Sequence, residues 1–173
     1  MRMISPFRAT QFSRKSLIIL SFSLILLSCG VYTFSPSAIG DIKSIAVPLF
    51  DNQTTESGLR ELLTDQLSQA YVSDNTIKIA SQTQADGIVK GSVTNYVREA
   101  YTYTQAEVVS QYKCTITVSV EFTNRRSGKV IWAEKGLSNW GLYDSDTESE
   151  DIGKQRAVTK LVEDIVNKTV KGW

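Results

Sequence analysis

The residue types that most enzymes use for acid–base or nucleophilic chemistry are scarce in this chain. Its 173 residues include no histidine and only two cysteines. Without histidine there is no Ser–His or Cys–His nucleophile pair and no imidazole metal ligand. Two cysteines cannot complete a four-sulfur zinc site either. The composition therefore predicts a protein that is not an enzyme and that holds no metal or cofactor.

One run of carboxylates precedes the C-terminal segment. It consists of Asp144, Asp146, Glu148, Glu150 and Asp151. An EF-hand calcium loop that began at Asp144 would need glycine at its sixth position and glutamate at its twelfth. The chain has Ser149 and Gln155 at those places. Because acidic residues are favoured in the first turn of a helix, we interpret the run as a helix start.

The best candidate for binding an anion is a basic cluster in a predicted hairpin turn, formed by Arg125, Arg126 and Lys129. Paired guanidinium groups bind phosphate in a bidentate manner, so the cluster is a candidate contact for an anion. Arg98 is a further candidate on charge alone. The alternative is a solvated hairpin tip without a ligand. The formal net charge of +1 gives no general attraction to nucleic acid, and none is expected as a partner.

Four aromatic residues are candidates for a second contact surface, which would bind protein. They are Tyr96, Tyr101, Tyr103 and Trp140. Aromatic side chains are enriched at protein interfaces, although single exposed aromatics are also normal on a surface.

The first residues have the pattern of an export signal. An apolar run, Leu17–Leu27, follows a basic start that contains no acidic residue. A helix needs about 20 apolar residues to cross a bilayer, and this run is shorter. A charged head, a short apolar middle and small residues at its end are typical of a secretory signal peptide. The basic residues of the start are Arg2, Arg8, Arg14 and Lys15.

The apolar run ends in the letters LLSC, which resemble the bacterial lipobox, whose cysteine becomes the lipidated first residue of the mature protein. We therefore predict a signal peptide at 1–28, lipidation of Cys29, a lipidated tether at 29–41 and a single domain at 42–173. Gly30 follows the cysteine, and by resemblance to lipoprotein sorting rules the absence of Asp there favours the outer membrane. The alternative is a plain signal peptide with an incidental cysteine.

Several segments have the composition or alternation of β-strands. Pro48 cannot donate to a ladder, so the first strand should end at an edge or a bulge. A turn is expected at 51–54, and residues 99–110 lose the alternation and are interpreted as a strand end plus loop. The predicted strands are Ile42–Phe50, Thr76–Ala80, Gly87–Val97, Tyr112–Thr123 and Lys129–Lys135, the last continuing toward Trp140.

The clearest strand is Tyr112–Thr123, in which apolar and polar residues alternate without error. This period of two predicts one buried face and one wetter face, with Cys114 as a small buried residue. The turn 124–128 then leads into the returning strand as a hairpin.

Two segments have the apolar stripe of an amphipathic helix. The first runs over 59–71, with Thr55 as its expected N-cap, and the second runs over 152–166. Thr147 and Glu150 have the spacing of a capping box ahead of the second helix. Together these elements predict a two-layer α+β domain, with a four- to five-stranded mixed or antiparallel sheet and two helices on one face.

In the order of its motifs the chain resembles the LptE family of lipopolysaccharide-assembly lipoproteins. The resemblance spans nearly all of residues 29–173. It rests on LLSCG, IKSIAVPLFDNQTTESGLRELLTDQL, ADGIVKGSVTNY, YKCTITVSVEF and GKVIWAE. It implies a non-enzymatic protein held by lipid on the periplasmic side of the outer membrane. Such a protein plugs the LptD β-barrel, helps it to assemble and contacts lipopolysaccharide.

The chain departs from that family in one respect. The family's proposed lipopolysaccharide contacts are basic residues in the loop before the long strand and ahead of the last helix. Here Glu99–Tyr112 and Gly136–Gly153 contain no Lys or Arg. No binding residue is therefore carried over from the family.

A second resemblance leads to a different function. The opening letters IAVPLFDN, followed by an amphipathic helix, are also similar to CsgG-like and TolB-like lipoproteins. A protein of that kind would form a homo-oligomeric secretion pore or a periplasmic scaffold. The long hairpin at Tyr112–Lys135, close to the C-terminal helix, favours the LptE family.

Overall fold

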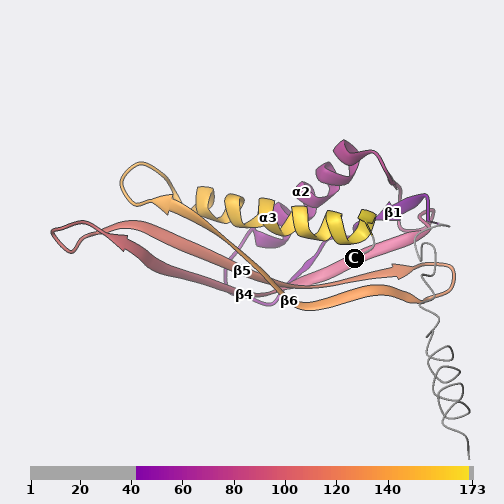
Figure 1. The fold of residues 1–173 in the computed structure, drawn as a ribbon. Helices are drawn as coiled ribbons and strands as arrows, with labels where there is room; N and C mark the ends of the chain where they lie inside the picture. Colours follow the sequence, from indigo (N-terminus) through magenta and orange to yellow (C-terminus); the bar gives the residue numbers. More distant parts are fainter. Residues whose placement is uncertain (1–41, 172–173) are drawn as a thin grey trace, which may run out of the picture. The chain divides into compact units, whose positions relative to one another are not determined.

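The structure, a computed structural model, describes residues 42–171 (Figure 1). The predicted signal peptide, the predicted lipidation site Cys29 and the predicted tether lie outside the described residues. None of the helices in the described part has the length and apolarity that a membrane crossing needs. The elements are β1 (Ser44–Ala46), β2 (Asp51–Asn52), α2 (Leu59–Asp74), β3 (Lys78–Ile79), β4 (Gly87–Tyr103), β5 (Val109–Asn124), β6 (Val130–Asp144) and α3 (Glu150–Lys171).

The strands form one mixed sheet, and both helices lie on the same face of it (Figure 1). The strand order is β3-β1-β4-β5-β6, with β2 also paired to β4. β1 runs parallel to β3 and β4, whereas β4, β5 and β6 form an antiparallel meander. The predicted two-layer α+β fold is thus confirmed, with six strands instead of four or five.

The extra strand comes from a segment predicted as a turn. Asp51 and Asn52 pair with β4 at Ser92 and Val93. The strand predicted at 42–50 is correspondingly shorter, because β1 ends at Ala46. Pro48 follows and has no N–H to donate, which explains the interruption between β1 and β2.

The hairpin of β4 and β5 is longer than predicted. β4 continues to Tyr103 and pairs with Val109, so the connecting loop covers only 104–108. The prediction of a strand end plus loop over 99–110 is wrong in extent, because the strand continues through three register shifts, at Val93/Asn95, Ala100/Thr102 and Thr102/Tyr103. Each bulge breaks the period of two on which the prediction depended, while the backbone pairing continues.

Both predicted helix caps are wrong. α2 begins after Gly58, which has a φ of 79°, and Thr54 rather than Thr55 accepts a backbone hydrogen bond, from Glu56 N at 3.2 Å. Thr147 lies in a turn ahead of α3. The Glu150 carboxylate accepts from Tyr96 Oη at 2.6 Å, so it does not close a capping box.

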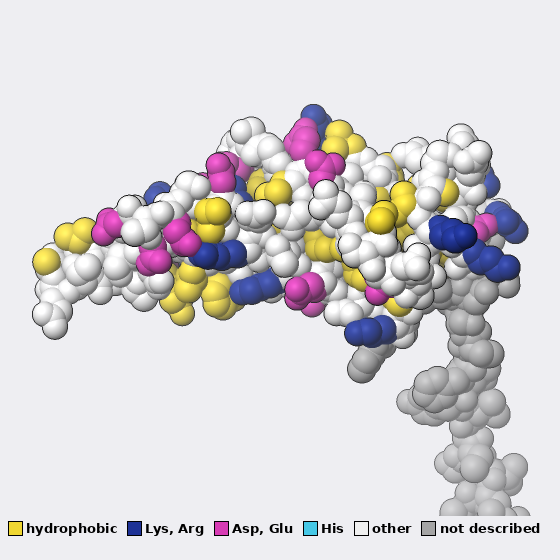
Figure 2. Space-filling model, turned by 90° about the horizontal axis from the view of Figure 1, so that it is seen from above, with side chains coloured by type: hydrophobic (Ala, Val, Ile, Leu, Met, Phe, Trp, Pro, Cys, Tyr) yellow, Lys and Arg dark blue, Asp and Glu magenta, His cyan; other side chains and the backbone are white. Residues whose placement is uncertain are grey.

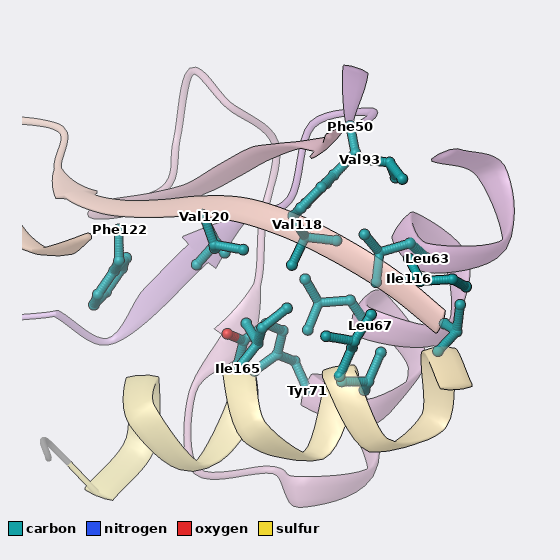
Figure 3. Close-up of a cluster of buried hydrophobic side chains, with 14 of the residues drawn as sticks. Phe50, Leu63, Leu67, Tyr71, Val93, Ile116, Val118, Val120, Phe122 and Ile165 are labelled. Atoms are coloured by element: carbon teal, nitrogen blue, oxygen red, sulfur yellow. The ribbon is translucent and has the colours of Figure 1, made fainter. Parts of the chain in front are cut away.

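The core lies between the helices and the inner face of the sheet (Figure 3). On β5 every second side chain from Cys114 to Phe122 is buried, as the alternation predicted. The helices run parallel, and at their C-terminal ends Tyr71 Oη donates to Thr169 Oγ1 at 2.7 Å. The core residues labelled in Figure 3 are Phe50, Leu63, Leu67, Tyr71, Val93, Ile116, Val118, Val120, Phe122 and Ile165.

Candidate functional site

The structure separates the basic candidates into two places. Arg125, Arg126 and Lys129 lie in and beside the turn between β5 and β6. Arg98 is paired in register with Cys114, ten positions along β5 from Asn124. At about 3.3 Å per residue, that separation is about 33 Å. A single small anion therefore cannot contact all of them.

The turn forms one side of a polar cavity of about 470 Å³, which is lined by Lys43, Asp86, Asn124, Arg126 and Ser127. Asp86 accepts hydrogen bonds from Ser44 Oγ at 2.9 Å and from Lys43 N at 3.2 Å, and it pairs with Arg126 Nη2 at 2.7 Å. These partners lower the pKa of Asp86, the Ser44 hydroxyl contributing most. The cavity is thus rimmed by cations, and its carboxylate is already fully engaged.

The turn is held rigidly enough to present its charges in fixed positions. Asn124 Oδ1 accepts from the backbone N–H groups of Arg126 and Ser127, both at 3.0 Å. Arg125 Nε donates to Ala85 O at 2.5 Å. The Arg126 side chain remains 74% exposed beside its ion pair, and Lys129 is exposed as well. Guanidinium and ammonium donors therefore remain available to an oxyanion.

Arg98 lies on the helix-facing side of the hairpin, where its guanidinium is engaged. Its Nε donates to Tyr143 Oη at 2.5 Å and lies 3.2 Å from Glu150 Oε2. The guanidinium carbon lies 3.8 Å from the centre of the Tyr112 ring. The Tyr143 hydrogen bond is the main cause that raises the pKa of Arg98. In this geometry Arg98 braces the hairpin against the start of α3.

Tyr96 belongs to the same brace and not to an exposed aromatic surface. Its hydroxyl bonds to Glu150 and lies 3.2 Å from Cys114 Sγ, and burial raises its pKa. Lys154 pairs with Glu56 and, at 3.4 Å, with Glu150. Burial alone would lower the pKa of Lys154, but these carboxylates raise it above its ordinary value. The cluster therefore connects β4, β5, α3 and the segment before α2.

The acidic run before α3 is also tied to cations. Glu148 forms a bidentate ion pair with Arg156, in which Nη1 donates to Oε2 and Nη2 donates to Oε1, both at 2.7 Å. Asp151 lies 3.4 Å from Lys154. Within residues 42–171 no three His, Cys, Asp or Glu side chains are grouped so that they could hold a metal ion.

Within residues 42–171, the other face of the sheet carries no helix and forms a second candidate surface. Tyr101 stacks on Trp140, with ring centroids 6.3 Å apart and planes inclined by 27°. Val97 is paired with Thr115 of β5, which is paired with Trp140 of β6, so Val97 and Trp140 lie in one row across the sheet. The side chains of Val97, Tyr101 and Trp140 are each at least 40% exposed. We call Val97, Tyr101 and Trp140 the outer-face patch.

Sequence reasoning found only part of this patch. It grouped Tyr96 with Tyr101 and Trp140, whereas the bulge between Val93 and Asn95 places Tyr96 on the opposite face. It missed Val97. Tyr103 lies farther along the hairpin and is 61% exposed. The alternation of β5 is the signal that could have placed Val97. Thr115 belongs to the polar face of β5, and Val97 is paired with Thr115, so Val97 lies on the same outer face.

The chain matches the family model of LptE, described as lipopolysaccharide-assembly, over residues 42–169. A search of curated protein sequences finds no match. Among solved structures, the fold is similar to that of the hypothetical protein CT253 from Chlamydia trachomatis. The TM-score is 0.54 and the identity 13%, and the alignment covers 74% of this chain and 96% of that one.

Two further structures share the fold. Protein XCC0632 from Xanthomonas campestris aligns with a TM-score of 0.56 and 11% identity, covering 75% of this chain and 84% of its own. The uncharacterized lipoprotein B from Nitrosomonas europaea aligns with a TM-score of 0.52 and 8% identity, covering 76% and 84%. At such low identities these likenesses show the fold alone.

Proposed function

Because the chain belongs to the LptE family of non-enzymatic outer-membrane lipoproteins for lipopolysaccharide assembly, we propose that it plugs an LptD-like β-barrel and assists its assembly. The family match carries this proposal, since residues 42–169 include every strand and nearly all of both helices. The geometry suits the role. A protein that acts by its shape needs a stable core and defined contact surfaces, and it needs no catalytic group.

The anchor is part of the same proposal. Lipidation of Cys29, after removal of a signal peptide at 1–28, would hold the domain on the periplasmic side of the outer membrane through the tether at 29–41. The LLSC motif supports this anchor. Acyl chains on one cysteine bind a bilayer firmly because each buried methylene contributes about 0.8 kcal/mol.

The outer face of the sheet is the proposed contact with the barrel. The interior wall of a membrane barrel is polar, so a surface that fits inside it should be polar with a few apolar contact points. The row Asn95, Thr117 and Ser138 on this face is uncharged and small. The outer-face patch lies beside that row and supplies the apolar contact area.

The basic turn is the proposed contact for phosphate groups of a lipid. Arg126 and Lys43 line the polar cavity at this turn, and Arg125 and Lys129 lie in the same turn, which supports that assignment. Arg98 stays a prediction from charge alone, and its engaged guanidinium makes it the weaker candidate.

A tagged pull-down from solubilised outer membranes tests the proposal. We expect a large β-barrel to co-purify in a one-to-one ratio, and depletion of the protein should cause lipopolysaccharide to accumulate inside the envelope. A ring of identical subunits would instead favour the CsgG-like or TolB-like alternative. Recovery of the protein alone, in the soluble fraction, would contradict both.

The barrel contact has its own matched test. Val97→Thr combined with Trp140→Thr should lower the yield of co-purified barrel at least fivefold while the variant still unfolds in one cooperative thermal transition. Val72→Thr is the control, because Val72 is 65% exposed on α2, away from the outer face. An unchanged yield with the double variant would rule out this face as the contact.

A further inference from the structure

Charge is distributed unequally between the two ends of the described fold. One end collects cations around the cavity at the turn, and we call it the basic end. It consists of Lys43, Lys78, Arg125, Arg126 and Lys129. Figure 2 shows dark-blue side chains gathered at the right-hand end of the described fold, with little magenta among them. Asp86 is the carboxylate in the lining of this cavity, and it is paired with Arg126.

The opposite end, around the hairpin loop 104–108 and the turn before α3, is acidic. Arg98, Lys113, Lys154 and Arg156 are its cations, and each of them is in an ion pair. The acidic residues there are Glu99, Glu107, Asp144, Asp146, Glu148, Glu150 and Asp151. The described domain therefore has a positive end and a negative end.

The topology places the start of the domain at the basic end. In register, Ile45 of β1 lies beside Gly87 of β4, which lies beside Asn124 of β5. Ser44 is paired with Lys78 of β3 in the same region. Lys43 lies one residue after the first described residue. The chain that precedes the fold is thus joined to it among the cations.

We propose that the basic end lies against the phosphate head groups of the phospholipid leaflet that holds the anchor, with the acidic end directed away. This inference rests on the proposed lipidation of Cys29, and it names the phosphates that the basic turn contacts. A fully extended tether from Cys29 to Asp41 reaches at most about 45 Å, which keeps the domain near the surface. Within that reach, basic side chains are attracted and acidic ones repelled by an anionic leaflet.

The exposure of the cations fits a contact with a surface. The side chain of Arg126 is 74% exposed, and Lys43, Lys78 and Lys129 are exposed as well. These side chains come from the residue before β1, from β3 and from the turn between β5 and β6, so together they cover an end of the domain and do not form a narrow pocket. Head groups can approach such an end without any change of the fold.

The test uses the full lipoprotein reconstituted in vesicles of phosphatidylcholine, with or without phosphatidylglycerol, that carry a quencher on their head groups. A fluorophore is placed at Ser127→Cys in the turn or, as a matched control, at Gln105→Cys in the hairpin loop. Cys114 is fully buried and should stay unlabelled. We expect at least threefold stronger quenching at position 127, an increase with phosphatidylglycerol, and loss of that increase at high salt.

Charge variants complete the design. Arg126→Gln with Lys129→Gln should abolish the effect of phosphatidylglycerol, whereas Lys113→Gln with Lys135→Gln removes equal charge elsewhere and should leave it in place. Equal quenching at the two label positions, or no dependence on phosphatidylglycerol, would overturn this inference and leave the proposed function in place. So would a response of position 127 to added lipopolysaccharide only. Failure to float with any vesicle would overturn the proposed anchor, and the inference with it.

Discussion

Tyr96 connects the long hairpin to the start of α3 through one phenol group. Its hydroxyl donates to Glu150 Oε1 at 2.6 Å, and Arg98 and Lys154 pair with the same carboxylate. A hydrogen bond to a charged acceptor contributes about 1.5 kcal/mol or more to stability. We expect Tyr96→Phe to lower the free energy of unfolding by about 1.5 kcal/mol in urea titrations. Tyr103→Phe, at an exposed position, is the control and should change nothing measurable.

The same cluster gives a dependence on pH. The Tyr96 hydrogen bond is the largest cause that lowers the pKa of Glu150, and Lys154 and Arg98 act in the same direction against burial. The unfolded chain then takes up the proton first, so the contribution of Glu150 is present above its ordinary pKa of 4.5 and is lost as the pH falls below it.

We therefore expect the stability difference between the parent protein and Tyr96→Phe to be largest at neutral pH and to shrink below about pH 4.5. Urea titrations between pH 3 and pH 7 measure it. A difference that stayed constant over that range would show that Tyr96 acts by packing and not through the Glu150 carboxylate.

Single residues could be predicted where the period of the strand is regular. The alternation of β5 identified Cys114 as buried, and it is fully buried. The same reasoning failed for Tyr96 because the bulge in β4 shifts the register by one position, which moves a side chain to the other face. A bulge adds a residue without a distinct residue type, so the sequence alone did not reveal it.

Between elements, the most regular contact is the seam of α3 along the free edge strand β6. Three residues on one side of the helix, spaced by four and by eight positions, reach β6: Arg156 donates to Leu142 O at 2.7 Å, Lys160 donates to Trp140 O at 2.9 Å and Lys168 pairs with Glu134 at 2.6 Å. Arg156 and Lys160 thereby occupy two backbone carbonyl groups of the edge strand. The seam therefore protects part of an edge that is prone to aggregate.

Close approach at this seam depends on Gly141. A Cβ atom at that position would lie 2.2 Å from Gly153 O and 2.6 Å from Arg156 Cβ, so the helix or the strand would have to move. We expect Gly141→Ala to lower the free energy of unfolding by about 2 kcal/mol, as overpacking does elsewhere. Urea denaturation measures this change. Lys135→Ala, at an exposed position of β6, should stay within about 0.5 kcal/mol, and equal effects of the two would contradict the role of the seam.

Elements were predictable in kind but less so in extent. Both helices and the β5–β6 hairpin follow from apolar stripes and alternation. The caps did not follow, because α2 begins after Gly58 in a left-handed conformation and because Glu150 is engaged by Tyr96, a neighbour that only the fold brings close. The short strand at Asp51 exists only because β4 lies beside it.

On the scale of the whole molecule, the described domain begins at Ile42, and the proposed lipid anchor lies in the residues before it. The core is made of residues from Ile42 to Ile165. The sequence identified the family through the order of its motifs. It did not reveal the unequal distribution of charge, because cations from β1, β3 and the β5–β6 turn meet only in the folded sheet.

The proposed anchor can be removed without changing the residues of the described domain. We expect replacement of residues 1–29 by an ordinary cleavable signal peptide to release the protein from the membrane fraction. The urea midpoint of the domain should stay unchanged, because its core begins after the tether. Barrel maturation should fall at least tenfold, because the local concentration supplied by the anchor is lost. Cell fractionation, denaturation and the heat-stable barrel signal on gels measure these three effects. If the protein stayed in the membrane and the barrel matured normally, neither the lipid anchor nor its proposed role in assembly could be retained.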